Sequence, residues 1–170
     1  MNIFAVQEHP RLAARDLCNK HVCKMCMESM QLLSTALHAK GMWQEGMARP
    51  YNPNHTAARW VKQSWSNFVW LLAHAQELYD EYERRFGRVH ASRARFRLVV
   101  GAVAAYVYQH GPLPHWDMHT PFVQCMPKKY QHANPVQAYR NFYILDKVRF
   151  AQWPAGGRPD WMAEAPVLVG

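Results

Sequence analysis

The sequence predicts an all-α protein, a compact single-domain bundle of about four main helices joined by long loops. Hydrophobic residues recur with helical spacing over four long segments, and no convincing pair of alternating strand patterns occurs. Of the 170 residues, 49% are apolar, which is enough to bury one core. We therefore expect one domain that spans residues 1–170.

The four expected helices follow one another at intervals set by glycine, proline and asparagine. Gly41 and Gly87 stop the first two helices, and Asn134 caps the last one, with Pro135 in its first turn. The second helix could break near residues 64–67. In chain order, the expected helices are residues 11–41, 55–86, 92–110 and 134–153. A loop rich in Gly, Pro and Asn follows the first helix, and a Pro-rich connection of about 25 residues precedes the last one. The tail after residue 153 has little helical pattern.

One line of polar residues runs along the first expected helix. Spaced three or four apart, they fall within an arc of roughly 80°, and they are His21, Lys24, Glu28, Gln31 and Thr35. The opposite side is mostly apolar and is expected to face the core. The stripe is either solvated surface, with a weak Lys24–Glu28 pair, or the floor of a site. In a site, an ionised Glu28 would stabilise a cationic transition state or transfer a proton.

The net charge of +8 is unevenly distributed. Residues 1–83 carry eight basic and eight acidic side chains, whereas residues 84–170 carry twelve and four. This pattern is typical of a protein that binds a polyanion, most often nucleic acid, although a merely basic protein would share it. Trp153 and Trp161 could stack on a displaced base or belong to the core. The candidate DNA contacts are Lys20, Gln31, Arg93, Arg95, Arg97, Lys128, Lys129, Arg140, Lys147 and Arg149.

Several common kinds of site are disfavoured. The chain has no P-loop, no dinucleotide-binding glycine fingerprint and no serine nucleophile elbow. The Cys and His residues between positions 18 and 26 point in diverging directions on a straight helix, so they cannot form one tetrahedral site. Histidines of the long loop, at 110, 115 and 119, leave a metal-dependent hydrolase as an alternative. We expect no cofactor and no metal.

Sequence features also indicate where the protein acts. No apolar run is long enough to cross a bilayer, and the first residues do not resemble a secretion signal. The four cysteines suit reduced thiols better than a disulfide framework. We therefore expect a monomer in the cytoplasm, without membrane contact.

Three segments resemble the bacteriophage pyrimidine-dimer DNA glycosylase/AP lyase family. Residues 19–29, NKHVCKMCMES, are similar to its first helix, because six residues separate His21 from Glu28, as they separate a His from the catalytic Glu in that family. Residues 65–87 look like its long helix, and residues 139–161 look like its C-terminal segment.

The resemblance implies a helical domain that bends double-stranded DNA, flips a base and needs no cofactor. In that family the N-terminal α-amine attacks the sugar C1′ atom, displaces the damaged base and forms a Schiff base, after which β-elimination cuts the strand. A terminal amine ordinarily titrates near pH 8, so part of it is neutral at pH 7. Glu28 would be the catalytic carboxylate, and the amine would belong to Met1, or to Asn2 if Met1 is removed. His21 and Lys24 complete the candidate catalytic residues.

This chain also differs from the family. Asn2 stands where the family has a small hydroxyl residue, and Met27 and Gln31 stand where it has arginines beside the Glu. Two further hypotheses therefore remain open. One is an enzyme on the same fold that modifies pyrimidines of phage DNA, and the other is a basic helical protein that binds nucleic acid without catalysis.

Overall fold

The computed structural model describes residues 1–163 and confirms the all-α prediction. No strand occurs within this range. The six α-helices are α1 (Pro10–Arg15), α2 (Asn19–Ala39), α3 (Thr56–Gln63), α4 (Trp65–Phe86), α5 (Arg93–His110) and α6 (Pro135–Leu145). Four single turns of 3-10 helix accompany them, namely η1 (Trp116–Met118), η2 (Lys128–Tyr130), η3 (Lys147–Arg149) and η4 (Asp160–Met162). Of the expected irregular tail, residues 164–170 lie outside the described range.

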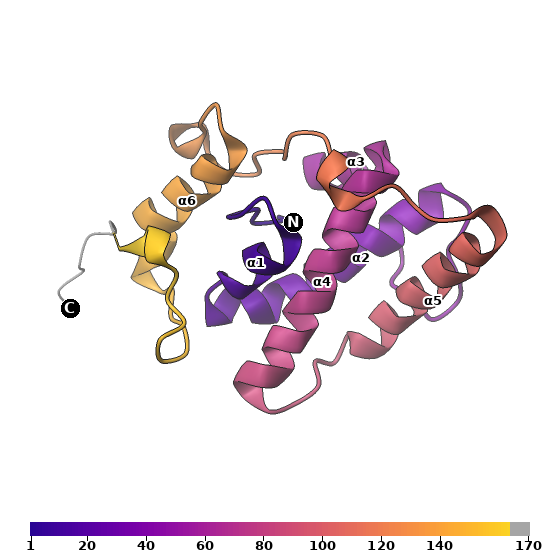
Figure 1. Cartoon of the computed structure of the whole chain (residues 1–170), viewed down its shortest axis with the longest axis horizontal. Helices are drawn as coiled ribbons and strands as arrows, with labels where there is room; N and C mark the ends of the chain where they lie inside the picture. Colours follow the sequence, from indigo (N-terminus) through magenta and orange to yellow (C-terminus); the bar gives the residue numbers. More distant parts are fainter. Residues whose placement is uncertain (164–170) are drawn as a thin grey trace.

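Helices α2 and α4 form the centre of the molecule. They pack against each other, α1 lies on α4, and α3 packs against both (Figure 1). Helix α5 packs on α2, while α6 packs with η2, η3 and η4. The chain begins in the middle of this arrangement, not at its edge (Figure 1). Among the described residues, no helix is both long enough and apolar enough to span a bilayer.

The first expected helix is two helices, which corrects the prediction of one continuous segment. Between α1 and α2 the chain is held by groups from the far end of the sequence. The indole nitrogen of Trp153 donates to the carbonyl oxygen of Asp16 (2.9 Å), and that of Trp161 donates to its carboxylate (2.7 Å). Asn19 N donates to the carbonyl oxygen of Gln152 (2.7 Å). These bonds replace those that a continuous helix would make, because buried backbone groups need partners.

The second expected helix breaks at Ser64, inside the region where a break was considered. Ser64 has extended dihedral angles (φ −149°, ψ 158°), and its hydroxyl accepts a hydrogen bond from Asn67 N (3.1 Å). It therefore ends α3 and caps α4. Gly87 ends α4 with φ 63°, as its position predicted.

The last helix begins as expected but ends earlier. The side-chain oxygen of Asn134 accepts from Val136 N (2.9 Å) and Gln137 N (3.2 Å), which caps α6. The helix stops at Leu145 instead of continuing to residue 153. Asp146 leaves the helical conformation (φ −125°, ψ −48°) and starts η3, from which the chain turns towards the beginning of α2.

Candidate active site

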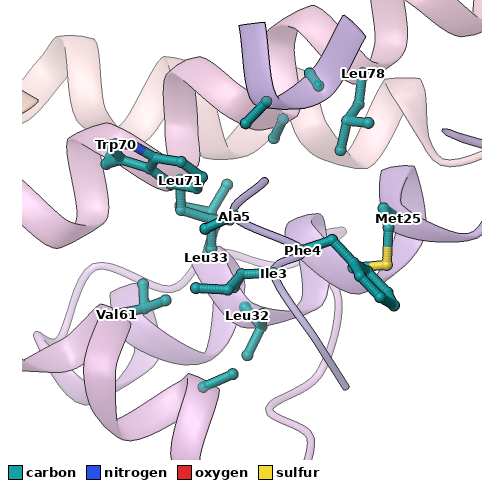
Figure 2. Packing of buried hydrophobic residues seen from close by; sticks show 14 of the residues in the cluster. Ile3, Phe4, Ala5, Met25, Leu32, Leu33, Val61, Trp70, Leu71 and Leu78 are labelled. Carbon is teal, nitrogen blue, oxygen red and sulfur yellow. The ribbon is translucent and has the colours of Figure 1, made fainter. Parts of the chain in front are cut away.

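The first residues of the chain are threaded into the hydrophobic core. The side chains of residues 3–6 are 0–5% exposed. Phe4 lies beside Met25 of α2, whereas Ile3 and Ala5 point to the other side of the segment (Figure 2). Phe4 has a positive φ of 42°, which is strained for a residue with a side chain. Surrounding packing therefore fixes the conformation of this segment.

Hydrogen bonds from other elements fasten the segment further along. Arg140 of α6 donates to the carbonyl oxygen of Val6 (2.9 Å) and to the side-chain oxygen of Gln7 (2.8 Å). The indole nitrogen of Trp70 in α4 donates to the carbonyl oxygen of Glu8 (2.7 Å). The position of the chain start is thus set by two helices distant in sequence.

Asn2 is held through both its backbone and its side chain. Its side-chain oxygen accepts from the backbone nitrogens of Ile3 (2.8 Å) and Phe4 (3.2 Å), a local turn typical of Asn. Its side-chain nitrogen donates to the carbonyl oxygen of Cys125 (2.9 Å). Its backbone nitrogen donates to Oε2 of Glu28 at 3.0 Å. Residue 2 therefore presents its nitrogen to the carboxylate with little freedom to move.

Glu28 joins the chain start to the polar stripe of α2. While Oε2 accepts from Asn2, Oε1 lies 3.3 Å from Nζ of Lys24, one turn earlier on the helix. The Glu28 side chain is 15% exposed and that of Lys24 is 66% exposed. An ammonium group and a backbone N–H thus hold the two oxygens of this carboxylate in place.

A hollow of about 340 Å³ lies over Glu28. It brings together the three parts of the chain that carry the candidate chemistry, which are the first residue, the polar stripe of α2 and the loop after α2. Its lining residues are Met1, Lys24, Met27, Glu28, Gln31 and Tyr51. The predicted residues Met1, Lys24, Glu28 and Gln31 therefore lie together, whereas Tyr51 was not predicted.

His55 is a second residue that the sequence did not reveal. Its ring nitrogen Nδ1 accepts from Ala57 N (3.1 Å), which caps α3. Burial lowers the pKa of His55, the positive amine of Met1 lowers it further, and the Glu28 carboxylate raises it. The imidazole thus lies within electrostatic reach of the Met1 amine and the Glu28 carboxylate. The only signals for Tyr51 and His55 were their places in a Pro- and Asn-rich loop between two helices.

His21, the remaining predicted catalytic residue of α2, is buried beneath the N-terminal segment. It is 5% exposed, its ring stacks on Phe4 with centroids 4.1 Å apart, and Nδ1 is hydrogen-bonded to the hydroxyl of Tyr143. Burial lowers the pKa of His21 to about 3, helped by neighbouring lysines of which Lys147 contributes most. The imidazole is therefore neutral and lies under the N-terminal segment, outside the lining of the hollow.

The predicted DNA contacts fall into several groups. Arg93 is ion-paired with Asp80 (3.0 Å), and Arg140 holds the N-terminal segment, so both guanidiniums are used inside the protein. Lys20 and Lys147 lie over the same Phe150 ring, 4.6 Å and 5.8 Å from its centre. The remaining predicted cations are at least partly exposed, and they are Arg95, Arg97, Lys128, Lys129 and Arg149.

Of the two roles considered for Trp153 and Trp161, their contacts favour packing within the protein, because both are partly buried against the core. Both donate their indole N–H to Asp16, and the Trp161 ring meets Tyr143 edge-on. They fasten the C-terminal segment to the turn between α1 and α2.

Cysteine and histidine chemistry contributes little to this site. All four cysteines are free thiols. In the portion of the chain that the structure covers, no three His, Cys, Asp or Glu side chains converge as metal ligands.

Comparison with known proteins identifies the family to which the chain belongs. A family model described as pyrimidine dimer DNA glycosylase matches residues 1–94, more than half of the chain. The chain belongs to this family. The match confirms the resemblance drawn from the sequence, and it contains every residue that lines the hollow over Glu28. Neither the curated proteins nor the solved structures contain a match.

Membership carries a function at the level of the family. It implies pyrimidine dimer DNA glycosylase activity, DNA as the substrate and a role in DNA repair. The matched region ends at Ala94, within the first turn of α5, so the rest of the chain is characterised by the structure alone.

Proposed function

We propose that the protein is a DNA glycosylase/AP lyase that removes damaged pyrimidines from double-stranded DNA through a Schiff base with its N-terminal amine. Glu28 is the catalytic carboxylate, and the protein acts as a monomer in the cytoplasm of a bacterial or phage-infected cell. The observation that carries the proposal is the 3.0 Å separation between Asn2 N and Glu28 Oε2, beside a hollow that is open to a ligand.

Removal of Met1 would turn the nitrogen of Asn2 into the terminal amine. The same atom that now donates to Glu28 would then be a primary amine already held beside a carboxylate. Met1 also lines the hollow, so its loss would widen the space above Glu28. We therefore assign the nucleophile to Asn2, and a retained Met1 would place its own amine in the same hollow.

The geometry supports the following reaction. The neutral amine attacks C1′, the N–C1′ bond forms, and the glycosidic bond breaks with its electron pair leaving on the pyrimidine. Glu28 stabilises the developing positive charge on the sugar and accepts a proton from the attached nitrogen. The C1′–O4′ bond then breaks with its electron pair leaving on O4′, which takes this proton from Glu28, and the C1′=N imine forms. Loss of a C2′ proton then expels the 3′ phosphate, and water hydrolyses the imine. Lys24 keeps the carboxylate oriented from its other oxygen.

The DNA backbone would pass along the exposed side of α2. Lys20 lies towards its beginning, over the Phe150 ring, and supplies the charge on this side, because Lys147 of η3 is ion-paired with Asp146 (2.9 Å). Gln31 lies one turn after Glu28, on the side where Arg95 of α5 approaches. Positive charge therefore flanks the carboxylate on both sides, which is suited to a phosphate backbone passing over the site.

Borohydride trapping on duplex DNA with one abasic site tests the proposal. Wild-type protein should form a covalent adduct and cut the strand, whereas Glu28→Gln should lose roughly 10²-fold or more in rate because an amide cannot accept the proton. The matched control is Glu83→Gln, which changes an exposed carboxylate on α4 and should react like the wild type. Intact mass identifies the amine.

Three results would contradict the proposal. Wild-type protein that forms no adduct would exclude the Schiff base. Modified nucleosides without strand scission would indicate a base-modifying enzyme. Binding and every other property left unchanged by Glu28→Gln would indicate a non-catalytic DNA-binding protein.

A further inference from the structure

A second hollow of about 460 Å³ lies beside the one over Glu28. Gln31 and Tyr51 line both, so the two spaces share a wall and adjoin each other. The second is formed mainly by residues 46–51, the end of the loop that follows α2, with Arg95 of α5 opposite them. A ligand that extends beyond the site of chemistry on this side must therefore enter it.

The charge of this second hollow is wholly positive. Arg49 and Arg95 are its two charged lining residues, and no acidic side chain lines it. Within residues 1–163, neither guanidinium has an ion pair or a side-chain hydrogen bond. Arg93, two residues before Arg95, is by contrast bound to Asp80 (3.0 Å). Two arginines facing one space without a partner repel each other unless an anion joins them.

The loop that carries Arg49 is held on a rigid base. The carbonyl oxygen of Ala48 accepts from the hydroxyl of Ser34 (2.5 Å) and from the indole nitrogen of Trp43 (2.9 Å). Tyr51 N donates to the hydroxyl of Thr35 (3.1 Å). Bonds to α2 thus lie on both sides of Arg49, so its backbone is ordered before a ligand arrives.

Gly46 couples this loop to α5. It has a positive φ of 91°, and a Cβ atom built there would lie 2.9 Å from a terminal carbon of Leu98. The positive φ is what requires glycine at this position, and the neighbouring Leu98 side chain shows that α5 packs directly on the loop. Because Leu98 lies less than one turn after Arg95, this packing holds Arg95 across the hollow from Arg49.

We propose that Arg49 and Arg95 form a subsite for a backbone phosphate of the DNA strand, next to the nucleotide that reacts at Glu28. Guanidiniums bind phosphate oxygens in a forked geometry, which makes arginine well suited to this task. Gln31 and Tyr51 form the wall between the phosphate subsite and the site of chemistry. This inference rests on the proposed function in one respect only, that DNA lies over Glu28.

The test combines protein variants with neutralised phosphates. Binding of a labelled duplex with one stable abasic analogue is measured at several salt concentrations for wild type, Arg49→Ala, Arg95→Ala and Arg11→Ala. Each subsite variant should bind roughly threefold to tenfold more weakly and reduce the slope of log K against log salt by about one. Arg11 is the matched control, because it is an exposed arginine on another helix, α1, lies outside the lining of the hollow and is not a candidate DNA contact.

Methylphosphonate substitution then locates the phosphate. Neutral linkages are introduced one at a time on each side of the abasic analogue. For wild type, one or two adjacent positions should weaken binding, and the loss should vanish in the Arg49→Ala/Arg95→Ala double variant. The wild-type measurement leaves the protein unaltered, so it does not depend on how a variant folds.

The outcomes separate this inference from the proposed function. Arg49→Ala and Arg95→Ala that bind like Arg11→Ala, or a methylphosphonate loss that persists in the double variant, would overturn the subsite even where borohydride trapping succeeds. Conversely, a position-specific loss that depends on the two arginines would support the subsite even if no adduct forms.

Discussion

At the scale of single residues, Asn2 makes the reactive geometry. Its side chain accepts from two backbone nitrogens and donates to Cys125, and these bonds aim the residue's own nitrogen at Glu28. A reactive group fixed in this way loses little entropy at the transition state. In the proposed reaction, the side chain of Asn2 would therefore position the amine.

Asn2→Ala should slow the chemistry without weakening DNA binding. The variant loses the local turn and the bond to Cys125, so the amine samples orientations away from Glu28. We expect single-turnover adduct formation to fall about tenfold at unchanged Kd, once intact mass has shown the state of Met1. Asn2→Ser, which keeps an acceptor oxygen, should recover part of the rate.

A second asparagine variant is the control for the Asn2→Ala prediction. Asn54→Ala changes an exposed Asn in the loop before α3 and should react at the wild-type rate. A proportional loss of affinity and rate in Asn2→Ala would instead point to general damage of the fold.

Among the site residues, the sequence predicted those whose proximity depends only on their spacing along one helix. Glu28, Lys24 and Gln31 share a helix face, so a regular helix brings them together. His21 shares that face too, yet Phe4 and Tyr143 cover it, and both come from elsewhere in the chain. Helical periodicity shows which residues of one helix share a face, but it does not show which other part of the chain packs on that face.

At the scale of elements, helix boundaries depend on distant partners. Ser64 and Asn134 cap their helices with their own side chains, and such local signals could be read from the sequence. The turn between α1 and α2 has no comparable signal. It depends on Asp16, whose carboxylate accepts from Gln7 (2.6 Å) and from Trp161 (2.7 Å), far before and after it.

Asp16→Ala should therefore destabilise the fold by about 2 kcal/mol. The change removes the acceptor of two partly buried N–H donors, and a donor left without a partner costs about 1–3 kcal/mol. Asp117→Ala is the control, because Asp117 is 61% exposed and pairs only with the exposed His115. Urea denaturation measures both, and equal midpoints for the two variants would refute the role given to Asp16.

At the scale of the whole molecule, two buried neutral histidines tie stability to pH. Burial lowers the pKa of His21 to about 3 and that of His74 to about 4. His74 lies under Trp70 and donates from Nδ1 to the carbonyl oxygen of Pro10 (2.9 Å). In the unfolded chain both would titrate near a pKa of about 6.5, so between that value and the lowered pKa the unfolded state binds more protons.

We therefore expect full stability above about pH 6.5 and a progressive loss as the pH falls towards about 4. The loss should be on the order of a few kcal/mol and should appear as a falling Tm. His74→Gln should reduce this pH dependence, whereas His110→Gln, at an exposed position, should leave it unchanged. A Tm that stays constant from about pH 7 to about pH 4.5 would contradict this account.

The fold class could be predicted because hydrophobic periodicity pervades the chain, and the family resemblance was carried by a local helix pattern. The site as a whole could not. Its three parts are the chain start, α2 and the loop that carries Tyr51, and only tertiary packing brings them together. The roles of Trp153 and Trp161 could not be predicted from the sequence either, because both indole N–H groups donate to Asp16, which is distant in the sequence.

The anchoring of the first residues has a consequence for biosynthesis. The first residues leave the ribosome at the outset, but Cys125, which accepts from Asn2, and Trp70 and Arg140, which donate to residues 6–8, are translated much later. In a nascent chain the N-terminal amine is therefore present long before the residues that fix its position have been made. An affinity tag fused ahead of Met1 would replace that amine with a peptide bond. Recombinant enzyme should accordingly be made with an untagged first residue.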